Sequence, residues 1–257
     1  MLRAFVIAAA AAAAGVIILL HGGWAATPAW KLLIPLLVAS GFATWGAINV
    51  RSNYFVRTHS KGKRSDKSVA LSFDDGPLTE FTPQILDILA QFNVRAAFFC
   101  IGHRAEQEPA LMKRIVGEGH LVGNHSFSHS PTFDLQTTAA MKADLARANQ
   151  VIKSATGLQP RLFRPPYGVT NPMLARAIRK GKFIAVGWSV RSFDTVIKDE
   201  DKLFERVTKK IEAGDIFLFH DTAAATVRIL PALIKQLKRD GFAIKRLDEL
   251  LNIPAYA

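Results

Sequence analysis

A regular alternation of short apolar runs and amphipathic patterns over residues 68–250 constrains the fold more than any other feature. The runs have strand length, and the segments between them carry apolar residues at helical spacing that end at glycines such as Gly119, Gly157 and Gly214. Without Asn-Gly hairpin turns, this alternation predicts a parallel sheet. The predicted strands are 69–73, 96–101, 120–123, 161–163, 183–188, 216–219 and 242–244.

Seven strand–helix units fit a closed or nearly closed α/β barrel, and an open doubly wound sheet is the alternative. No glycine pattern typical of dinucleotide binding or of a phosphate-binding loop follows the first strand. In such barrels the chemistry is carried by side chains at the carboxyl ends of the strands. The residues at these ends are therefore the candidates for a functional site.

Two strand ends carry groups that bind metals. The first ends in Asp74 and Asp75, and the Gly-Pro that follows can turn the chain so that both carboxylates enter one pocket. The third leads into His125 and His129, which one helical turn would aim at a common point. Taken singly, Asp-Asp-Gly-Pro is typical of a turn, and a histidine pair at this spacing is a weak signal.

Three further strand ends carry polar groups. Arg164 follows the fourth strand and is suited to orient a carboxylate, Asp194 follows the fifth, and His220 ends the sixth. A lone histidine after an apolar strand is usually a core residue. It is the recurrence of Asp, His, Arg, Asp and His at successive strand ends that predicts one common site.

The order of these residues resembles the motifs of the NodB-type polysaccharide deacetylases, carbohydrate esterase family four. Residues 72–77 are similar to the family's first motif and residues 125–129 to its His-x-x-x-His motif, while residues 164–167 and 218–220 match the third and fifth. The resemblance covers residues 68–246. It implies a hydrolase of linear amides with a distorted (β/α)7 barrel, in agreement with the seven predicted strands.

The resemblance also implies one divalent metal ion, held by Asp75, His125 and His129. A carboxylate and two imidazoles with open coordination positions suit Zn²⁺, with Co²⁺ or Ni²⁺ as alternatives. Such an ion lowers the pKa of a bound water and polarises an amide carbonyl.

The remaining roles follow by analogy with the family. Asp74 is expected to be the general base, oriented by Arg164, and His220 the general acid, with a pKa that Asp194 raises. A backbone N–H near Tyr167 is expected to help hold the developing oxyanion. The expected substrate contacts come from Pro166, Tyr167 and Leu218.

The expected reaction removes an N-acetyl group from amino-sugar residues of a polysaccharide or cell-envelope glycan. Alternatives within the family are deformylation or deacetylation of a lipid-linked amino sugar, and hydrolysis of O-acetyl esters. The fourth motif departs from the family pattern, since Arg191 and Thr195 stand where Asp and Trp are usual. Because that Trp helps wall the sugar groove in relatives, the departure affects the substrate more than the chemistry.

Residues 1–50 hold only two charged side chains, Arg3 and Lys31. Two apolar runs, 4–20 and 32–50, have the length of membrane-spanning helices and predict a two-helix anchor in contact with lipid, hence a multi-pass protein of the cell membrane. The alternative for the first run is a signal peptide that is cleaved near residue 25.

Basic residues dominate 51–67 and predict a juxtamembrane linker before a catalytic domain at 68–250. By the positive-inside rule, this charge favours a cytoplasmic catalytic domain, whereas the family resemblance favours an extracytoplasmic one.

Other protein classes fit less well. The net charge of +12 suggests nucleic acid, but the basic residues cluster beside the apolar segment and no recognition motif is present, so no nucleic-acid partner is expected. Iron oxygenases with two histidines and a carboxylate place these ligands in a different order. A non-enzymatic sugar-binding domain would have lost acid, base or ligand residues. The single cysteine, Cys100, excludes a cysteine-based zinc cluster.

Overall fold

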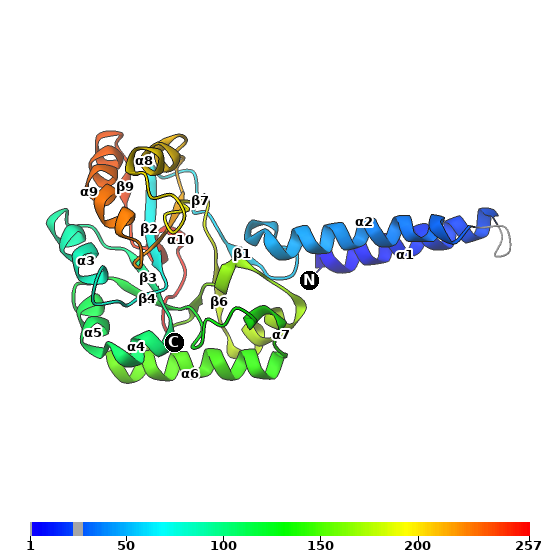
Figure 1. Ribbon diagram of the computed structural model, residues 1–257, viewed down its shortest axis with the longest axis horizontal. Coiled ribbons are helices and arrows are strands. Elements are labelled where there is room, and N and C mark those ends of the chain that lie inside the picture. The colour runs from blue at the N-terminus through cyan, green and yellow to red at the C-terminus, as the bar shows by residue number, and fades with distance from the viewer. Residues whose placement is uncertain (1, 23–27) are drawn as a thin grey trace.

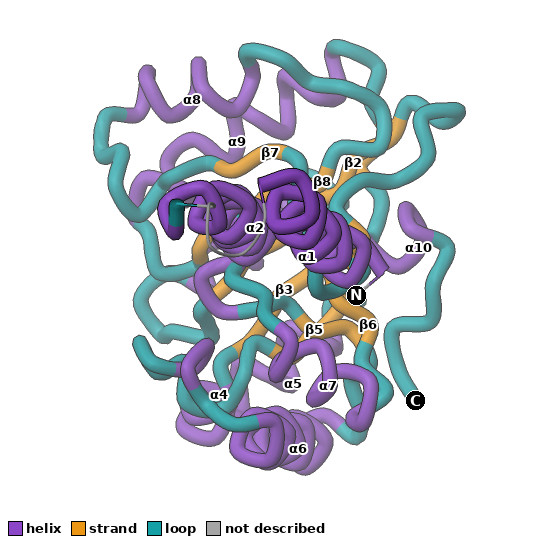
Figure 2. The backbone as a smooth tube through the Cα atoms, turned by 90° about the vertical axis from the view of Figure 1, so that its right-hand side faces the viewer, coloured by secondary structure: helices purple, strands orange, loops and turns teal. Residues whose placement is uncertain are grey.

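The computed structural model describes residues 2–22 and 28–257. In this part of the chain nine strands form one sheet, in the order β1-β6-β5-β4-β3-β2-β8-β7, with β9 paired to β2. Every strand pair is parallel. The helices α3, α5, α6, α8 and α9 pack against one face of the sheet, in an α/β half-barrel (Figures 1 and 2). The predicted α/β class and parallel sheet are confirmed.

The structure contains all seven predicted strands and adds two short ones, β1 and β7. Neither added strand is an apolar run, since β1 consists of Thr and His and β7 of Val and Arg, so the sequence gives no signal for them. The strands are β1 (Thr58–His59), β2 (Ser68–Asp74), β3 (Ala97–Cys100), β4 (Leu121–Asn124), β5 (Leu162–Phe163), β6 (Ile184–Val186), β7 (Val190–Arg191), β8 (Ile216–His220) and β9 (Ala243–Ile244).

Helices follow most strands, and their ends carry the expected signals. Thr137 caps α6 by accepting a hydrogen bond from the Ala140 N–H, and the helix stops at Gly157, which has a φ of 76°. The helices are α3 (Thr82–Gln91), α4 (Gly102–Gln107), α5 (Pro109–Gly117), α6 (Thr138–Thr156), α7 (Pro172–Gly181), α8 (Glu200–Thr208), α9 (Ala224–Arg239) and α10 (Leu247–Leu251), with 3-10 turns η1 (Val50–Ser52), η2 (Phe133–Leu135) and η3 (Pro166–Gly168).

The central strand β2 is buried along its whole length and forms the core of the domain. The Phe73 ring stacks on Phe98 of β3 and on Phe219 of β8, with centroid distances of 5.1 and 6.1 Å. Burying one such ring contributes about 1.5–3 kcal/mol. The strand that ends in Asp74 is therefore held rigidly between its two neighbours.

Two N-terminal helices, α1 (Leu2–Gly22) and α2 (Ala29–Ile48), lie side by side and project from the domain (Figure 1). The last turn of α2 is bound to the domain, because the Ala47 carbonyl accepts a hydrogen bond of 2.9 Å from the Thr170 N–H. The Gly46 carbonyl accepts another, of 3.0 Å, from the Ser52 hydroxyl.

The predicted membrane anchor is wrong. Among the described residues, no helix is both long enough and apolar enough to cross a bilayer. Lys31 and Pro35 lie within α2, and the last turn, which the prediction assigned to the second span, packs on the globular domain. The multi-pass membrane localisation, the charge-based sidedness and the lipid partner of residues 1–50 lose their basis. The alternative cleavage site near residue 25 lies outside the described residues.

The predicted linker, residues 51–67, is part of the fold. Its strand β1 pairs with β6, and the side chains of Tyr54 and Val56 are buried. Lys61 forms ion pairs with Glu212 and Asp215, at 2.6 and 3.1 Å. The basic residues that suggested a solvated linker are thus partly used in contacts with the domain.

Candidate active site

The carboxyl end of β2 brings two acids into one cavity. Asp74 is the last residue of the strand, and the parallel register sets it beside His220 of β8. The backbone leaves the strand at Asp75, which has a φ of 80°, so the two carboxylates do not point to opposite faces. The Arg104 guanidinium donates to the Asp75 carbonyl at 2.8 Å and holds this turn.

A third acid, Asp221, lies behind the turn and has no role in the sequence-based prediction. Its carboxylate accepts a hydrogen bond of 2.7 Å from the Thr82 hydroxyl, and its backbone N–H donates to the Asp74 carbonyl at 3.2 Å. Burial raises the pKa of Asp221 to about 7, against the opposing effect of the Thr82 hydrogen bond. A Cβ atom on Gly76 would overlap this carboxylate, so only glycine fits at the turn.

Gly76→Ala is expected to lower the free energy of unfolding by about 1–3 kcal/mol, the usual cost of overpacking. It is also expected to lower activity, because relief of the overlap moves Asp74 and Asp75. Thermal unfolding and a turnover assay measure both effects. The control is Gly117→Ala at the end of α5, where an added Cβ meets no atom within 4 Å. Equal stability of the two variants would contradict the steric argument.

The two histidines of the His-x-x-x-His motif lie on a loop rather than on the predicted helical turn. Ser126 and His129 have φ angles of 64° and 44°, which a helix does not allow. Side chains hold the loop instead: Asp144 of α6 accepts hydrogen bonds from the backbone N–H groups of Phe127 and Ser128, at 2.6 and 3.1 Å. No local pattern in the sequence indicates Asp144, because it lies on a helix that comes later in the chain than the loop it contacts.

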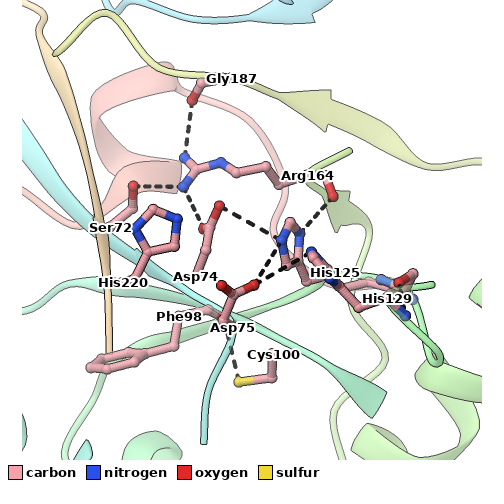
Figure 3. A network of polar contacts seen from close by, with 12 residues as sticks. Ser72, Asp74, Asp75, Phe98, Cys100, His125, His129, Arg164, Gly187 and His220 are labelled. Carbon is pink, nitrogen blue, oxygen red and sulfur yellow. Dashed lines mark hydrogen bonds and ion pairs between the residues drawn. The ribbon is translucent and has the colours of Figure 1, made fainter. Parts of the chain in front are cut away.

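The loop nevertheless aims both imidazoles at one carboxylate. The Nε2 atoms of His125 and His129 each lie 3.4 Å from Asp75 Oδ1, and one ligand atom from each residue falls within 4.8 Å of the others. His125 donates from Nδ1 to the Arg164 carbonyl at 2.9 Å, which leaves Nε2 free to accept or coordinate (Figure 3). The three predicted ligands thus meet at one point.

The charges around this point favour a cation. Burial and the neighbouring His125 lower the pKa of His129 to about 4, so its imidazole is neutral, as a metal ligand must be. Burial lowers the pKa of His125, but the Asp74 and Asp75 carboxylates outweigh it and raise that pKa. Burial raises the pKa of Asp75, and its contacts with His125 lower it by more.

Arg164 is fully buried beside Asp74. Its Nη1 donates to Asp74 Oδ1 at 2.7 Å and to the Ser72 hydroxyl at 2.9 Å, and its Nη2 donates to the Gly187 carbonyl at 3.0 Å (Figure 3). The guanidinium carbon lies 4.1 Å from the centre of the Phe99 ring. Asp74 therefore has one fixed orientation, with Oδ1 bound and Oδ2 turned toward His125, 3.9 Å away.

Beside Asp74, at the end of β8, His220 forms a pair with Asp194. The Nδ1 atom of His220 donates to Asp194 Oδ1 at 2.7 Å, which leaves Nε2 for a substrate. Asp194 is fully buried and also accepts from the His220 N–H and the hydroxyls of Ser192 and Thr226. Burial lowers the pKa of His220, but the hydrogen bond and the charge of Asp194 outweigh this effect and raise that pKa to about 9.

A cavity of about 300 Å³ is lined by Asp74, Asp75, His125, His129 and His220. Of the expected substrate contacts, Tyr167 and Leu218 line it, whereas Pro166 is buried within η3 and is not among the lining residues described. The Tyr167 hydroxyl donates to the His129 carbonyl at 3.2 Å. Arg164 and Asp194 lie behind the wall, each bound to a group that faces the cavity. Trp188, which the prediction left without a role, completes the wall.

Comparison with known proteins gives the same assignment. The sequence profile described as polysaccharide deacetylase matches residues 61–185. The chain is 32% identical over 194 residues to the peptidoglycan-N-acetylmuramic acid deacetylase PdaA of Bacillus subtilis, covering 74% of this chain and 73% of the relative. It is 36% identical over 213 residues to the chitooligosaccharide deacetylase of a Bradyrhizobium species, covering 77% and 96%.

Solved structures agree with the sequence comparison. The crystal structure of the Bc1960 peptidoglycan N-acetylglucosamine deacetylase superposes with a TM-score of 0.73 and 32% identity, over 78% of this chain and 95% of that one. The predicted family and the predicted class of enzyme, a hydrolase of amide bonds, are confirmed. With its fold, its motif order and these relatives, the chain belongs to the polysaccharide deacetylase family, carbohydrate esterase family four.

Proposed function

We propose that the chain is a metal-dependent deacetylase that hydrolyses the N-acetyl group of amino-sugar residues in a glycan. The convergence of Asp75, His125 and His129 on one point, in the same cavity as Asp74 and His220, is the observation that carries this proposal. The relatives named above act on peptidoglycan or chitooligosaccharide, both built of N-acetylated amino sugars, and they support this substrate class.

The donor set fits a divalent cation of intermediate softness. One carboxylate and two imidazoles, which coordinate in their deprotonated form, leave coordination positions open for substrate and water, as in hydrolytic zinc sites, and Co²⁺ or Ni²⁺ suit the same ligands. The Nδ1–H of His125 is held by the Arg164 carbonyl, which is the usual outer contact of a metal-binding imidazole. A bound ion supplies Lewis-acid polarisation of the acetyl carbonyl and acidifies water.

Asp74 is the general base in this proposal. Its Oδ1 is held by Arg164, and its Oδ2 faces the histidine ligands, where it can take a proton from the water that attacks the acetyl carbon. The proton then resides on the Asp74 carboxylate. Arg164 is a positioning residue, because its guanidinium contacts Asp74 and does not line the cavity.

His220 is the general acid. With Nδ1 bound to Asp194, it presents Nε2 to the cavity and remains protonated at neutral pH, since its pKa is about 9. The Nε2 proton passes to the amide nitrogen as the C–N bond breaks, so that acetate and a free amine form. Asp194 stabilises the imidazolium and holds the ring in place.

The remaining predicted residues bind the sugar. Tyr167 and Leu218 line the cavity next to the reacting groups, and the backbone N–H of Tyr167 is proposed to bind the developing oxyanion. Pro166 shapes the η3 turn that carries Tyr167. The proposed catalytic unit is residues 68–250, folded as a distorted (β/α)7 barrel, which the seven strand–helix units support.

The test follows acetate release by the full chain from N-acetylglucosamine oligomers and from peptidoglycan. Chelation is expected to abolish release, and Zn²⁺, Co²⁺ or Ni²⁺ to restore it. His125→Ala is expected to lose bound metal and to lower activity about 100-fold or more, because it removes a ligand.

His21→Ala is the matched control, since His21 is exposed on α1 and far from the metal ligands in the chain. It is expected to retain both metal and activity. Metal content measured by mass spectrometry separates loss of the ion from loss of the fold. Undiminished acetate release after chelation would contradict the proposed metal dependence.

A further inference from the structure

The altered fourth motif places an arginine at the rim of the reaction cavity. Arg191 ends β7, and its guanidinium carbon lies 5.6 Å from the centre of the Trp188 ring and 4.6 Å from that of Phe193. All three residues line the cavity that holds Asp74, Asp75 and His220. The two rings fix a cationic group where the family usually carries an acid.

The same arginine lines a second groove of about 450 Å³, which runs along α8. Arg206 of α8 contacts two residues of the reaction cavity. Its Nε donates to the Arg191 carbonyl at 3.1 Å, and its guanidinium carbon lies 4.4 Å from the centre of the Phe193 ring. The charged side chains that line this α8 groove are Arg191, Lys202, Arg206, Lys209, Lys210 and Glu205. The groove is therefore lined by five basic side chains and one acidic side chain.

The surrounding acids neutralise only part of this charge. Among the described residues, the ion pairs leave Arg191 and Arg206 without a carboxylate partner, while Lys202 and Lys210 pair with Asp199 and Glu212 outside the groove lining. Asp194, three residues from Arg191, is fully buried and turns both carboxylate oxygens inward to His220 and Thr226. The α8 groove keeps a positive field that is continuous with the reaction cavity.

We propose that the α8 groove binds an anionic group, a phosphate or a carboxylate, which the amino-sugar substrate carries beside the acetylated sugar. Arginine side chains held by aromatic rings present paired N–H donors that match the oxygens of such groups, and the lysines add charge. This inference rests on the proposed function and narrows its substrate class from neutral to acidic glycans. Arg191, which lines both cavities, links recognition of the anion to placement of the acetyl group.

The experiment compares three substrates of the full, metal-loaded chain. These are a neutral N-acetylglucosamine oligomer, the same oligomer with a terminal 1-phosphate, and an oligomer that contains N-acetylmuramic acid and so carries carboxylates. At low salt, kcat/KM is expected to be about 10-fold or more higher for an anionic substrate, since a charge-assisted hydrogen bond contributes at least that factor. The advantage is expected to shrink as salt is added. The substrate that shows this higher kcat/KM identifies whether the bound anion is a phosphate or a carboxylate.

Variants test the groove itself. Arg206→Gln is expected to lower the ratio of anionic to neutral kcat/KM about 10-fold, mainly through KM. Lys209→Gln, just beyond the last turn of α8, is expected to lower it in the same direction and cannot disturb the Arg191 carbonyl contact. Arg179→Gln removes the same charge from the exposed face of α7, away from α8 in Figure 1, and is expected to leave the ratio unchanged.

The outcomes separate this inference from the proposed function. Hydrolysis of the neutral oligomer with no preference for either anionic substrate, or equal ratios in Arg206→Gln and Arg179→Gln, overturns the anion site alone. Absence of acetate release from every acetylated sugar contradicts the proposed function. In that case calorimetry with N-acetylglucosamine 1-phosphate still tests the anion site. The site requires that the unsubstituted chain binds this compound and that Lys209→Gln weakens the binding.

Discussion

Asp74→Asn is expected to lower kcat by about 10²- to 10⁴-fold, the usual contribution of a positioned proton acceptor. Asparagine keeps the shape of the side chain and an oxygen for Arg164, but it cannot take the proton from the attacking water. Asp75, His125 and His129 are unchanged, so bound metal is expected to remain. The measurement is acetate release together with metal content.

The same change also leaves Arg164 buried without its counter-ion. Arg164 is fully buried and its only ion pair among the described residues is with Asp74, at 2.7 Å. Breaking such a pair from one side typically costs about 3–5 kcal/mol of folding free energy. Loss of activity by Asp74→Asn is therefore informative only at a temperature where the variant is shown to be folded.

Ser72→Ala is the control that separates these two effects. Ser72 accepts a second hydrogen bond from Arg164, at 2.9 Å, and donates to the Phe217 carbonyl at 2.6 Å. Its removal is expected to lower stability by about 1–3 kcal/mol while kcat stays within about tenfold. If Ser72→Ala lost as much turnover as Asp74→Asn, the base role of Asp74 would not stand.

The predictable part of the fold is the part with local periodicity. Strands such as β2 and β8 are continuous apolar runs because they are buried on both faces, and their ends can be read from where polar residues begin. The parallel order then brings Asp74, the histidine loop and His220 together without knowledge of any side-chain contact. This is why most of the candidate site could be predicted from the sequence.

The sequence-based predictions fail where the local structure depends on contacts with residues far away in the chain. The histidine loop is not a helical turn, because Asp144 of α6 and Asn124 satisfy its backbone N–H groups. The second apolar run was assigned to a membrane span, although Thr170 binds its last turn. An apolar sequence indicates that a surface is buried, but not whether lipid or another part of the protein buries it. The α8 groove was missed because Arg191 and Arg206 meet only in the fold.

The His220–Asp194 pair gives the second large effect, which is seen in the pH profile. Asp194→Asn is expected to move the alkaline limb of kcat/KM about 1–3 pH units lower, because loss of the partner charge leaves burial to lower the pKa of His220. Turnover at pH 8 falls as the acid becomes deprotonated. Asp199→Asn is the matched control: Asp199 is exposed and caps α8, and asparagine caps equally well, so the profile is expected to stay unchanged.

Stability provides an independent readout of the same pair. The raised pKa of His220 stabilises the fold fully below its ordinary value of 6.5, and this stabilisation disappears as pH rises through about 9. The pKa of Asp194, which burial raises and the His220 contacts lower by more, stabilises the fold above the ordinary value of 3.8. The difference in unfolding free energy between the unsubstituted chain and Asp194→Asn is therefore expected to be largest between pH 4 and 6.5 and to shrink toward pH 9. A difference that does not vary with pH, together with an unmoved alkaline limb, would mean that Asp194 holds the His220 ring in place without setting its charge, and that another group supplies the proton to the leaving amine.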